Sequence, residues 1–117
     1  MNTRLLGAMG EQCAARYLRK KGYDIFSANF SINTGEIDIV AFKDNILCFV
    51  EVKTRREGGM FAPAEAVGYS KRENLKSTAS AYMNRCGFNY EYRFDIVEVL
   101  VDENMKVTSI NHIENAF

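Results

Sequence analysis

The first segment of the chain repeats its apolar residues with the spacing of a helix. Between residues 3 and 21 they return every three or four positions, and most basic side chains fall on the opposite side. Gly22 follows a basic last turn and is a typical stop signal. We therefore expect a helix from Thr3 to Lys21, with Glu11 at the margin of its apolar face and Gly7 and Gly10 within it, where small residues allow close packing on a sheet. The other residues of this face are Leu6, Met9, Cys13, Ala14, Tyr17 and Leu18.

Three segments with strand-like composition follow. They read YDIFSANF (residues 23–30), EIDIVAFK (36–43) and ILCFVEVKTR (46–55). The turn signals SINTG and Asp44-Asn45 separate them, and a short Asp-Asn turn suits a hairpin. We therefore expect three strands joined by short turns.

A second helix is indicated by a start signal, an apolar stripe and a stop signal. Ser70 and Glu73 have the spacing of a capping box, in which each side chain bonds the backbone of the other residue. Gly87 is the expected end of the helix. The stripe that should face the sheet consists of Leu75, Ala79, Tyr82 and Cys86.

The remaining segments complete a mixed sheet. Gly58, Gly59 and Pro63 mark a loop before the second helix. After that helix, YEYRFDIVEVLVD predicts a long strand and KVTSINHIENAF predicts a further strand. Short turns join the first three strands, whereas a helix crossover precedes the fourth, so the strand directions should be mixed. The expected class is α/β, with the order helix, three strands, helix, two strands.

Length and composition indicate one folded domain. The chain has 117 residues, of which 47% are hydrophobic and 26% charged, and we expect a single domain over residues 1–117. No apolar run approaches the ~20 residues that span a bilayer, so we expect no membrane partner. Glu11 and Gln12 interrupt the apolar stretch that a signal peptide needs. Three widely spaced cysteines without a C-x-x-C pair predict core residues in a cytoplasmic protein.

The net charge and the histidine content limit the kinds of binding and catalytic chemistry that we expect. The formal net charge is zero, so the molecule has no overall basic field towards nucleic acid, although local clusters can still be basic. His112 is the only histidine, which leaves little for a zinc site or a histidine-dependent nucleophile. We expect chemistry from carboxylates, lysine and a hard metal ion. We expect His112 to be structural, and Asp95 to pair with Arg93 or with the second helix.

An acid and a base interrupt the most apolar strand. Glu51 and Lys53 lie two residues apart and therefore share a face. Asp38 lies six residues before the Asp44-Asn45 turn and Glu51 six after it, so a hairpin makes them near cross-strand neighbours. Opposed like charges destabilise a sheet, and a divalent cation would offset that cost. The expected faces are Leu47, Phe49, Glu51, Lys53 and Arg55 in one strand, and Glu36, Asp38, Val40 and Phe42 in the other.

These residues belong to a wider resemblance. Asp38, a thirteen-residue step to Glu51, and the triplet EVK resemble the PD-(D/E)xK nuclease pattern, with Ile37-Asp38 in place of the literal Pro-Asp. The chain is identified as a member of the YraN-like family of small bacterial proteins in that superfamily, which is related to archaeal Holliday-junction resolvases. The matching stretches are GEQCAARYLRKKGY, GEIDIVA, FVEVKTR, AVGYSK, RFDIVEV and HIENAF, and they cover essentially the whole chain.

The resemblance implies a fold and a set of roles. It implies a restriction-endonuclease-like sheet with a helix-strand-strand-strand-helix-strand core. Asp38 and Glu51 are expected to bind Mg²⁺ or Mn²⁺, aided by the carbonyl of Val52. Lys53 is expected to orient the attacking water or to stabilise charge on the scissile phosphate. Glu11 corresponds to a first-helix glutamate that such nucleases place beside the metal.

The resulting hypothesis is a metal-dependent endonuclease that hydrolyses phosphodiester bonds in DNA, including branched or structured DNA. RNA is the less favoured substrate, and the small domain is compatible with a homodimer. One alternative is a nucleic-acid-binding or scaffold protein that keeps the fold without turnover, and another is a protein-interaction module. Glu51 with Lys53 also fits a solvated ion pair, and Glu11 a helix-surface acid. A phosphate-binding rim and an ordinary solvated surface are equally weighted for Arg55, Arg56, Lys71, Arg72 and Lys76.

Overall fold

A computed structural model describes residues 3–57 and 68–117 of the chain. The loop predicted around Gly58, Gly59 and Pro63 lies outside these residues. The order of the elements is the predicted one. The helices are α1 (Thr3–Lys20) and α2 (Tyr69–Cys86), and the strands are β1 (Asp24–Ile32), β2 (Gly35–Lys43), β3 (Ile46–Arg56), β4 (Glu91–Val101) and β5 (Val107–Ile113).

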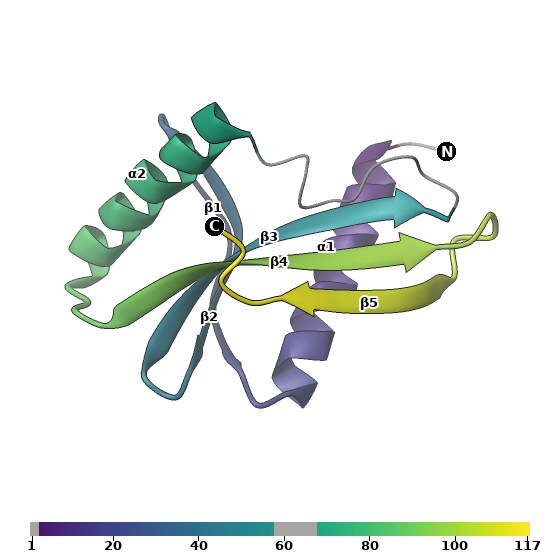
Figure 1. The fold of residues 1–117 in the computed structure, drawn as a ribbon, viewed down its shortest axis with the longest axis horizontal. Coiled ribbons are helices and arrows are strands. Elements are labelled where there is room, and N and C mark those ends of the chain that lie inside the picture. The colour runs from purple at the N-terminus through teal and green to yellow at the C-terminus, as the bar shows by residue number, and fades with distance from the viewer. Residues whose placement is uncertain (1–2, 58–67) are drawn as a thin grey trace.

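The strands form one open, mixed sheet in the order β1-β2-β3-β4-β5. Only β3 and β4 are parallel, and the α2 crossover joins them, whereas the other neighbours are antiparallel. Asp44 and Asn45 have φ values of 53° and 63°, the left-handed conformations that a two-residue hairpin favours. The predicted α/β class is therefore confirmed, and the arrangement is compatible with a restriction-endonuclease-like fold. Figure 1 shows the two helices against this sheet.

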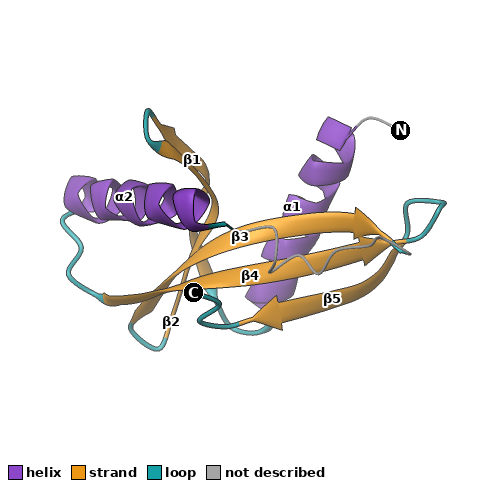
Figure 2. Cartoon of the chain, turned by 45° about the horizontal axis from the view of Figure 1, so that its top comes forward, coloured by secondary structure: helices purple, strands orange, loops and turns teal. Residues whose placement is uncertain are grey.

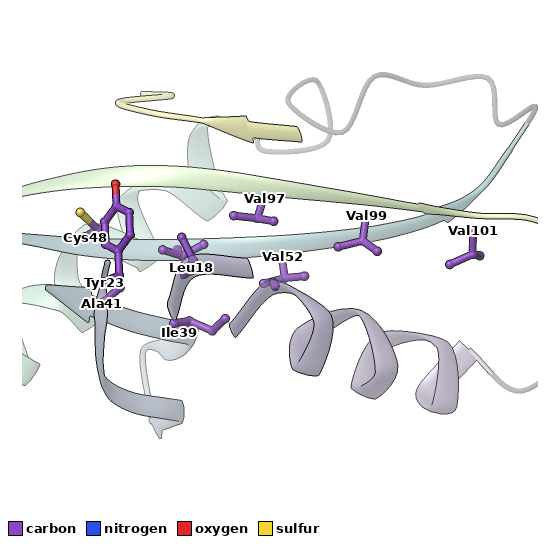
Figure 3. Close-up of a cluster of buried hydrophobic side chains, with 11 residues drawn as sticks. Leu18, Tyr23, Ile39, Ala41, Cys48, Val52, Val97, Val99 and Val101 are labelled. Carbon is purple, nitrogen blue, oxygen red and sulfur yellow. The ribbon is translucent and has the colours of Figure 1, made fainter. Parts of the chain in front are cut away.

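Each helix covers a different face of the sheet. On one face, Ala14 and Leu18 of α1 pack against valines of β3 and β4, as Figure 3 shows for Leu18. On the other face, Leu75, Ala79 and Tyr82 of α2 pack against apolar residues of β2, β3 and β4. In Figure 2, the β1-β2 hairpin turns away from the direction of the other three strands. The sheet therefore opens at the junction of β2 and β3, between the two helices.

Several details of the second helix differ from the prediction. The capping box is wrong: α2 begins at Tyr69, and Gly68 is its N-cap without a side-chain cap hydrogen bond. Ser70 therefore lies inside the first turn, and Glu73 instead pairs with Lys76 at 3.4 Å. Gly87 ends the helix in a left-handed conformation, as predicted (φ 68°). Of the predicted stripe, Cys86 is exposed, while Thr78 is buried.

Two further predictions concern the burial of the cysteines and the absence of a membrane-spanning helix. Cys13, Cys48 and Cys86 are free thiols, and only Cys48 is fully buried, so the predicted core location is wrong for Cys86. Cys86 is the last residue of α2. In the ranges 3–57 and 68–117, no helix is long and apolar enough to cross a membrane.

Close packing of α1 on the sheet depends on one glycine. A Cβ on Gly10 would lie 1.7 Å from Oγ1 of Thr54 in β3, whereas a Cβ on Gly7 would meet open space. We expect Gly10→Ala to lower the free energy of unfolding by about 1–3 kcal/mol, because α1 must move away from β3. Gly7→Ala is the matched control and should stabilise the helix by up to about 1 kcal/mol. Urea denaturation measures both, and equal effects would contradict this account of the contact.

Candidate functional site

The opening between β2 and β3 places Asp38 beside Glu51. The ladder between these strands ends at the pair Ile39–Val50, so the next residues along it are Asp38 and Glu51, as the hairpin predicts. In place of a further ladder bond, the amide of Val52 donates a hydrogen bond of 2.8 Å to Oδ2 of Asp38. The carboxylate is therefore fixed against β3 at the point where the sheet opens.

The alternation predicted for β2 fails at this point. Ile39 packs in the core on the α1 side, but Ile37 packs in the core on the α2 side, although residues two positions apart in a strand should share a face. Asp38 lines a cavity of about 420 Å³ beside α1, whereas Glu36 and Glu51 line one of about 200 Å³ beside α2. Alternation is therefore broken between Ile37 and Ile39, where the ladder with β3 has ended, although Glu36 still contributes to the raised pKa of Asp38.

Burial and neighbouring carboxylates strongly perturb the pKa of Asp38. Burial, followed by the neighbouring Glu51 carboxylate, raises the pKa of Asp38 to about 7. The Val52 amide opposes this shift, while Glu11 and Glu36 add to it. The carboxyl group therefore holds its proton more tightly than an exposed aspartic acid, unless a cation compensates the local negative charge.

Two lysines approach the same oxygen of Glu51. The side chain of Glu51 is only 9% exposed, and its Oε1 lies 3.1 Å from Nζ of Lys71 and 3.7 Å from Nζ of Lys53. Burial and then the neighbouring Lys71 lower the pKa of Lys53. Burial alone would also lower the pKa of Lys71, but the Glu51 carboxylate outweighs it and raises that pKa. Lys71 is thus the firmer partner of Glu51, and Lys53 is the ammonium that releases its proton more readily.

Glu11 of α1 lies towards the same site. It is partly buried and lines the 420 Å³ cavity together with Asp38. Burial, with repulsion from Glu36 and Glu51, raises the pKa of Glu11, while a hydrogen bond from the Asn29 side chain lowers it. The helix position expected for this acid is therefore found, and its role in the chemistry stays a prediction.

The predicted basic rim is divided in the structure. Lys71 contacts Glu51, and the guanidinium of Arg72 lies over the ring of Phe117, 5.4 Å from its centre. Arg55 is partly buried and Arg56 is exposed at the end of β3. Lys76 pairs with Glu73 on α2. Of these residues, Lys71 contacts a predicted site carboxylate, and a role of the set in binding phosphate stays a prediction.

Two neighbours of the site were missed by sequence reasoning. Asn29 of β1 has a φ of 56° and hydrogen-bonds Glu11 through its side chain. Asparagine is among the few residues that adopt this conformation readily, so an asparagine inside a predicted strand was the available signal. Asn74 of α2 lines the cavity beside Glu51 and Lys71, a placement that only the packing of α2 determines.

The donor set fits a hard divalent cation that keeps much of its water. Among the described residues, no three histidine, cysteine or acidic side chains are close enough together to form a metal-binding group. Mg²⁺ is usually bound through one or two carboxylates, with water and substrate phosphate completing its shell. Asp38 and Glu51 supply two carboxylates, and their repulsion is what such an ion would relieve.

The raised pKa of Asp38 gives a prediction for stability. Because its pKa rises from 3.8 to about 7 on folding, its favourable contribution is complete below pH 4 and is lost as pH rises towards 7. Asp38→Asn removes the charge and keeps an acceptor for the Val52 amide. Without metal, we expect the variant to be more stable than the native chain by about 3–4 kcal/mol at pH 8, with no gain below pH 4.

Thermal and urea unfolding between pH 3.5 and 8, with EDTA or Mn²⁺, measures this difference. Mn²⁺ should stabilise the native chain and leave Asp38→Asn unchanged, because an ion relieves repulsion only where both carboxylates are charged. An equal shift of both proteins by Mn²⁺, or a pH-independent gain in the variant, would contradict the assignment.

Comparison with known proteins places the chain among close relatives. The family model described as "Uncharacterised protein family UPF0102" matches residues 10–99, a range that contains Glu11, Asp38, Glu51 and Lys53. A UPF0102 protein of Alkaliphilus metalliredigens is 45% identical over 113 residues, which are 96% of each chain. One of Syntrophomonas wolfei is 48% identical over 115 residues, 97% of this chain and 98% of the relative. One of Caldicellulosiruptor saccharolyticus is 44% identical over 118 residues, the full length of both.

Proposed function

The chain belongs to the UPF0102 family, and we propose that it is a metal-dependent nuclease that hydrolyses phosphodiester bonds in DNA. The YraN-like family membership expected from the sequence is confirmed by these relatives. The wider relationship to PD-(D/E)xK nucleases is part of the proposal, as are nucleic acid as the partner and the homodimer.

One observation carries the proposal. The Asp38 carboxylate is held by the Val52 amide at 2.8 Å beside the buried Glu51, and the repulsion between the two acids raises the pKa of Asp38, after the effect of burial. A purely structural role does not explain why two carboxylates that repel each other lie side by side. Strongly perturbed carboxylates in a cavity are typical of functional sites.

A divalent cation would be held by Asp38 and Glu51, with the Val52 carbonyl as the proposed third ligand. When bound, such an ion lowers the pKa of a coordinated water and neutralises charge that develops on the phosphate. On Glu51, both lysines approach Oε1, so Oε2 is the oxygen that remains to face a cation. Lys71 thereby fixes the orientation of the carboxylate without occupying both of its oxygens.

Lys53 is the proposed electrostatic group of the reaction. Its ammonium lies beside Glu51 and is largely shielded from water, with 20% of its side chain exposed. A preorganised cation in such a site stabilises negative charge better than the same cation in water. Burial also lowers its pKa, so the proton on Nζ is more easily donated to a departing or bridging oxygen.

The alternative function is nucleic-acid binding or scaffolding without turnover. It is favoured by the two lysines at Glu51, which neutralise that acid without a metal ion. It is also favoured by the lack, within the described residues, of a three-ligand protein group. Under this alternative, the site contacts phosphate through lysine alone and binding does not need a divalent ion.

The test is a metal titration followed by a panel of labelled substrates. Purified protein is incubated with duplex, flap, four-way junction and single-stranded DNA in EDTA, Mg²⁺ or Mn²⁺, and products are separated on denaturing gels. Under the proposal, products appear only with Mg²⁺ or Mn²⁺ and disappear with Asp38→Asn. Binding to DNA without metal-dependent cleavage of any substrate would favour the alternative.

A further inference from the structure

Of the two cavities at the site, the larger lies beside α1, and Lys53 and Lys71 do not line it. Its volume is about 420 Å³, and residues of α1, β1 and β2 line it. Glu11 and Asp38 are part of its wall, so a ligand in the cavity lies directly against Asp38, one of the proposed metal ligands. We call it the α1 cavity. The predicted rim of Arg55, Arg56, Lys71 and Arg72 does not line it.

The chemistry of the wall has three parts. Small apolar side chains, among them Ala15 and Ala28, give a surface that a base or a sugar can contact. The amide side chains of Gln12 and Asn29 can both donate and accept hydrogen bonds. Arg16 and Arg19 add two guanidinium groups, the planar cations that suit phosphate oxygens.

The two arginines are available to a ligand. Both are exposed, and within the described part of the chain neither forms an ion pair with a carboxylate. They follow Glu11 on the same helix by five and eight residues, which corresponds to rises of about 7.5 Å and 12 Å along the axis. Cationic groups therefore continue from the acids along α1, as a wall that follows an extended phosphate backbone would require.

The size of the cavity limits the form of the ligand. Its volume falls within the roughly 300–1,000 Å³ range of clefts that enclose small molecules. That space suits a nucleotide unit. A DNA duplex cannot enter the cavity, because the duplex is wider than its own major groove of about 12 Å and its bases are stacked in its interior. A phosphate can reach Asp38 through this cavity only if its nucleotide is unpaired.

We propose that the α1 cavity binds an unpaired nucleotide of a single-stranded DNA segment next to the scissile phosphate, with Arg16 and Arg19 contacting its backbone. This inference rests on the proposed function and narrows its substrate class to DNA that carries a single-stranded region. The binding surface is thereby assigned to the α1 side, rather than to the rim that the sequence suggested at the end of β3 and the start of α2.

Binding is measured by fluorescence anisotropy with three labelled probes: a blunt duplex, the same duplex with a short single-stranded extension, and the free single strand. The buffer contains Ca²⁺, which also takes carboxylate ligands, and gels check that the probes stay intact. The extended duplex should bind at least about fivefold more tightly than the blunt duplex. The double variant Arg16→Ala/Arg19→Ala should lose about tenfold in affinity for it, with a salt slope smaller by about two.

The control is the double variant Lys20→Ala/Lys106→Ala, which removes the same charge from exposed positions outside the cavity wall. Its affinity for the extended duplex should stay within about twofold of the native value. Arg16→Lys/Arg19→Lys should recover part of the binding, and thermal unfolding confirms that every variant is folded. Equal losses in the arginine variant and the control, or equal affinity for blunt and extended duplexes, would overturn the proposal.

Failure of the inference and failure of the proposed function give different results. If the protein cleaves DNA but shows no preference for unpaired nucleotides and no dependence on Arg16 and Arg19, only the cavity assignment is wrong. If the preference and the arginine dependence are found but no metal supports cleavage, the cavity assignment stands and the nuclease activity is wrong.

Discussion

Lys53→Ala is expected to lower metal-dependent cleavage by about 100- to 1,000-fold, the typical loss when one preorganised stabilising group is removed from a transition state. The ammonium lies 3.7 Å from Glu51 and only 20% of its side chain is exposed, so truncation removes a preorganised positive charge from the site. DNA affinity should stay within a few fold, because one lysine is a small part of a phosphate-contacting surface.

Single-turnover cleavage and anisotropy on the same substrate separate the two effects. Lys76→Ala is the matched control, since Lys76 is an exposed lysine of α2 paired with Glu73, and its cleavage rate should be unchanged. Lys71→Ala should give an intermediate loss, because Glu51 keeps only its longer contact. A Lys53→Ala protein that cleaves at the native rate, or that loses binding and cleavage together, would refute the electrostatic role.

Asp95→Ala is expected to lower the free energy of unfolding by about 3–5 kcal/mol, because it removes the acceptor of a buried polar network. The carboxylate is fully buried and accepts hydrogen bonds from Arg93 at 3.0 Å and from the amide of Asn115 at 3.0 Å. Nε2 of His112 lies 2.8 Å from the other oxygen. An ionised carboxylate only accepts, so this nitrogen carries the proton. Truncation leaves Nε2 of the buried His112 without its acceptor and removes one partner each from Arg93 and from the Asn115 amide.

Urea denaturation measures the loss, and Glu73→Ala in an exposed ion pair, worth less than about 1 kcal/mol, is its control. Burial alone would raise the pKa of Asp95, but the hydrogen bonds from His112, Arg93 and Asn115 outweigh it and lower that pKa. The stabilisation is therefore complete above about pH 4 and is lost as pH falls through the lower folded pKa. A loss below 1 kcal/mol at pH 7 would show that the network is not held together by Asp95.

The sequence predicted those parts of the site that depend on local geometry. The Asp44-Asn45 turn determines the register of β2 and β3, and that register is enough to bring Asp38 next to Glu51. Strand alternation likewise places Arg93 and Asp95 on one face, and the predicted ion pair is found at 3.0 Å. In both cases, the partners are close along a hairpin or a single strand, so no tertiary packing has to be known.

The parts that failed depend on packing or on a break in regular structure. The contact of Lys71 with Glu51 was not predicted, because it depends on the position of α2 against the sheet. Alternation in β2 failed between Ile37 and Ile39, where the ladder with β3 has ended. The N-cap of α2 was misplaced by two residues, at Ser70 instead of Gly68, so Ser70 has no capping role. The third contact of Asp95 is His112 on β5. The sequence predicted a structural role for this histidine but not its partner, because the pairing of β4 with β5 brings the two residues together.

The parallel pairing of β3 with β4 also sets an order of assembly during folding. The pair Ile46–Glu91 joins residues 45 positions apart, whereas β1, β2 and β3 are joined through two-residue turns. Closing a long loop costs more entropy than closing a hairpin, so the three-stranded meander should form before the crossover. Asp38 and Glu51 both lie in this meander, and Lys71 arrives only with α2. The two acids therefore meet before their lysine does, and a divalent ion captured at that stage would act on the rate of folding as well as on the stability of the folded chain.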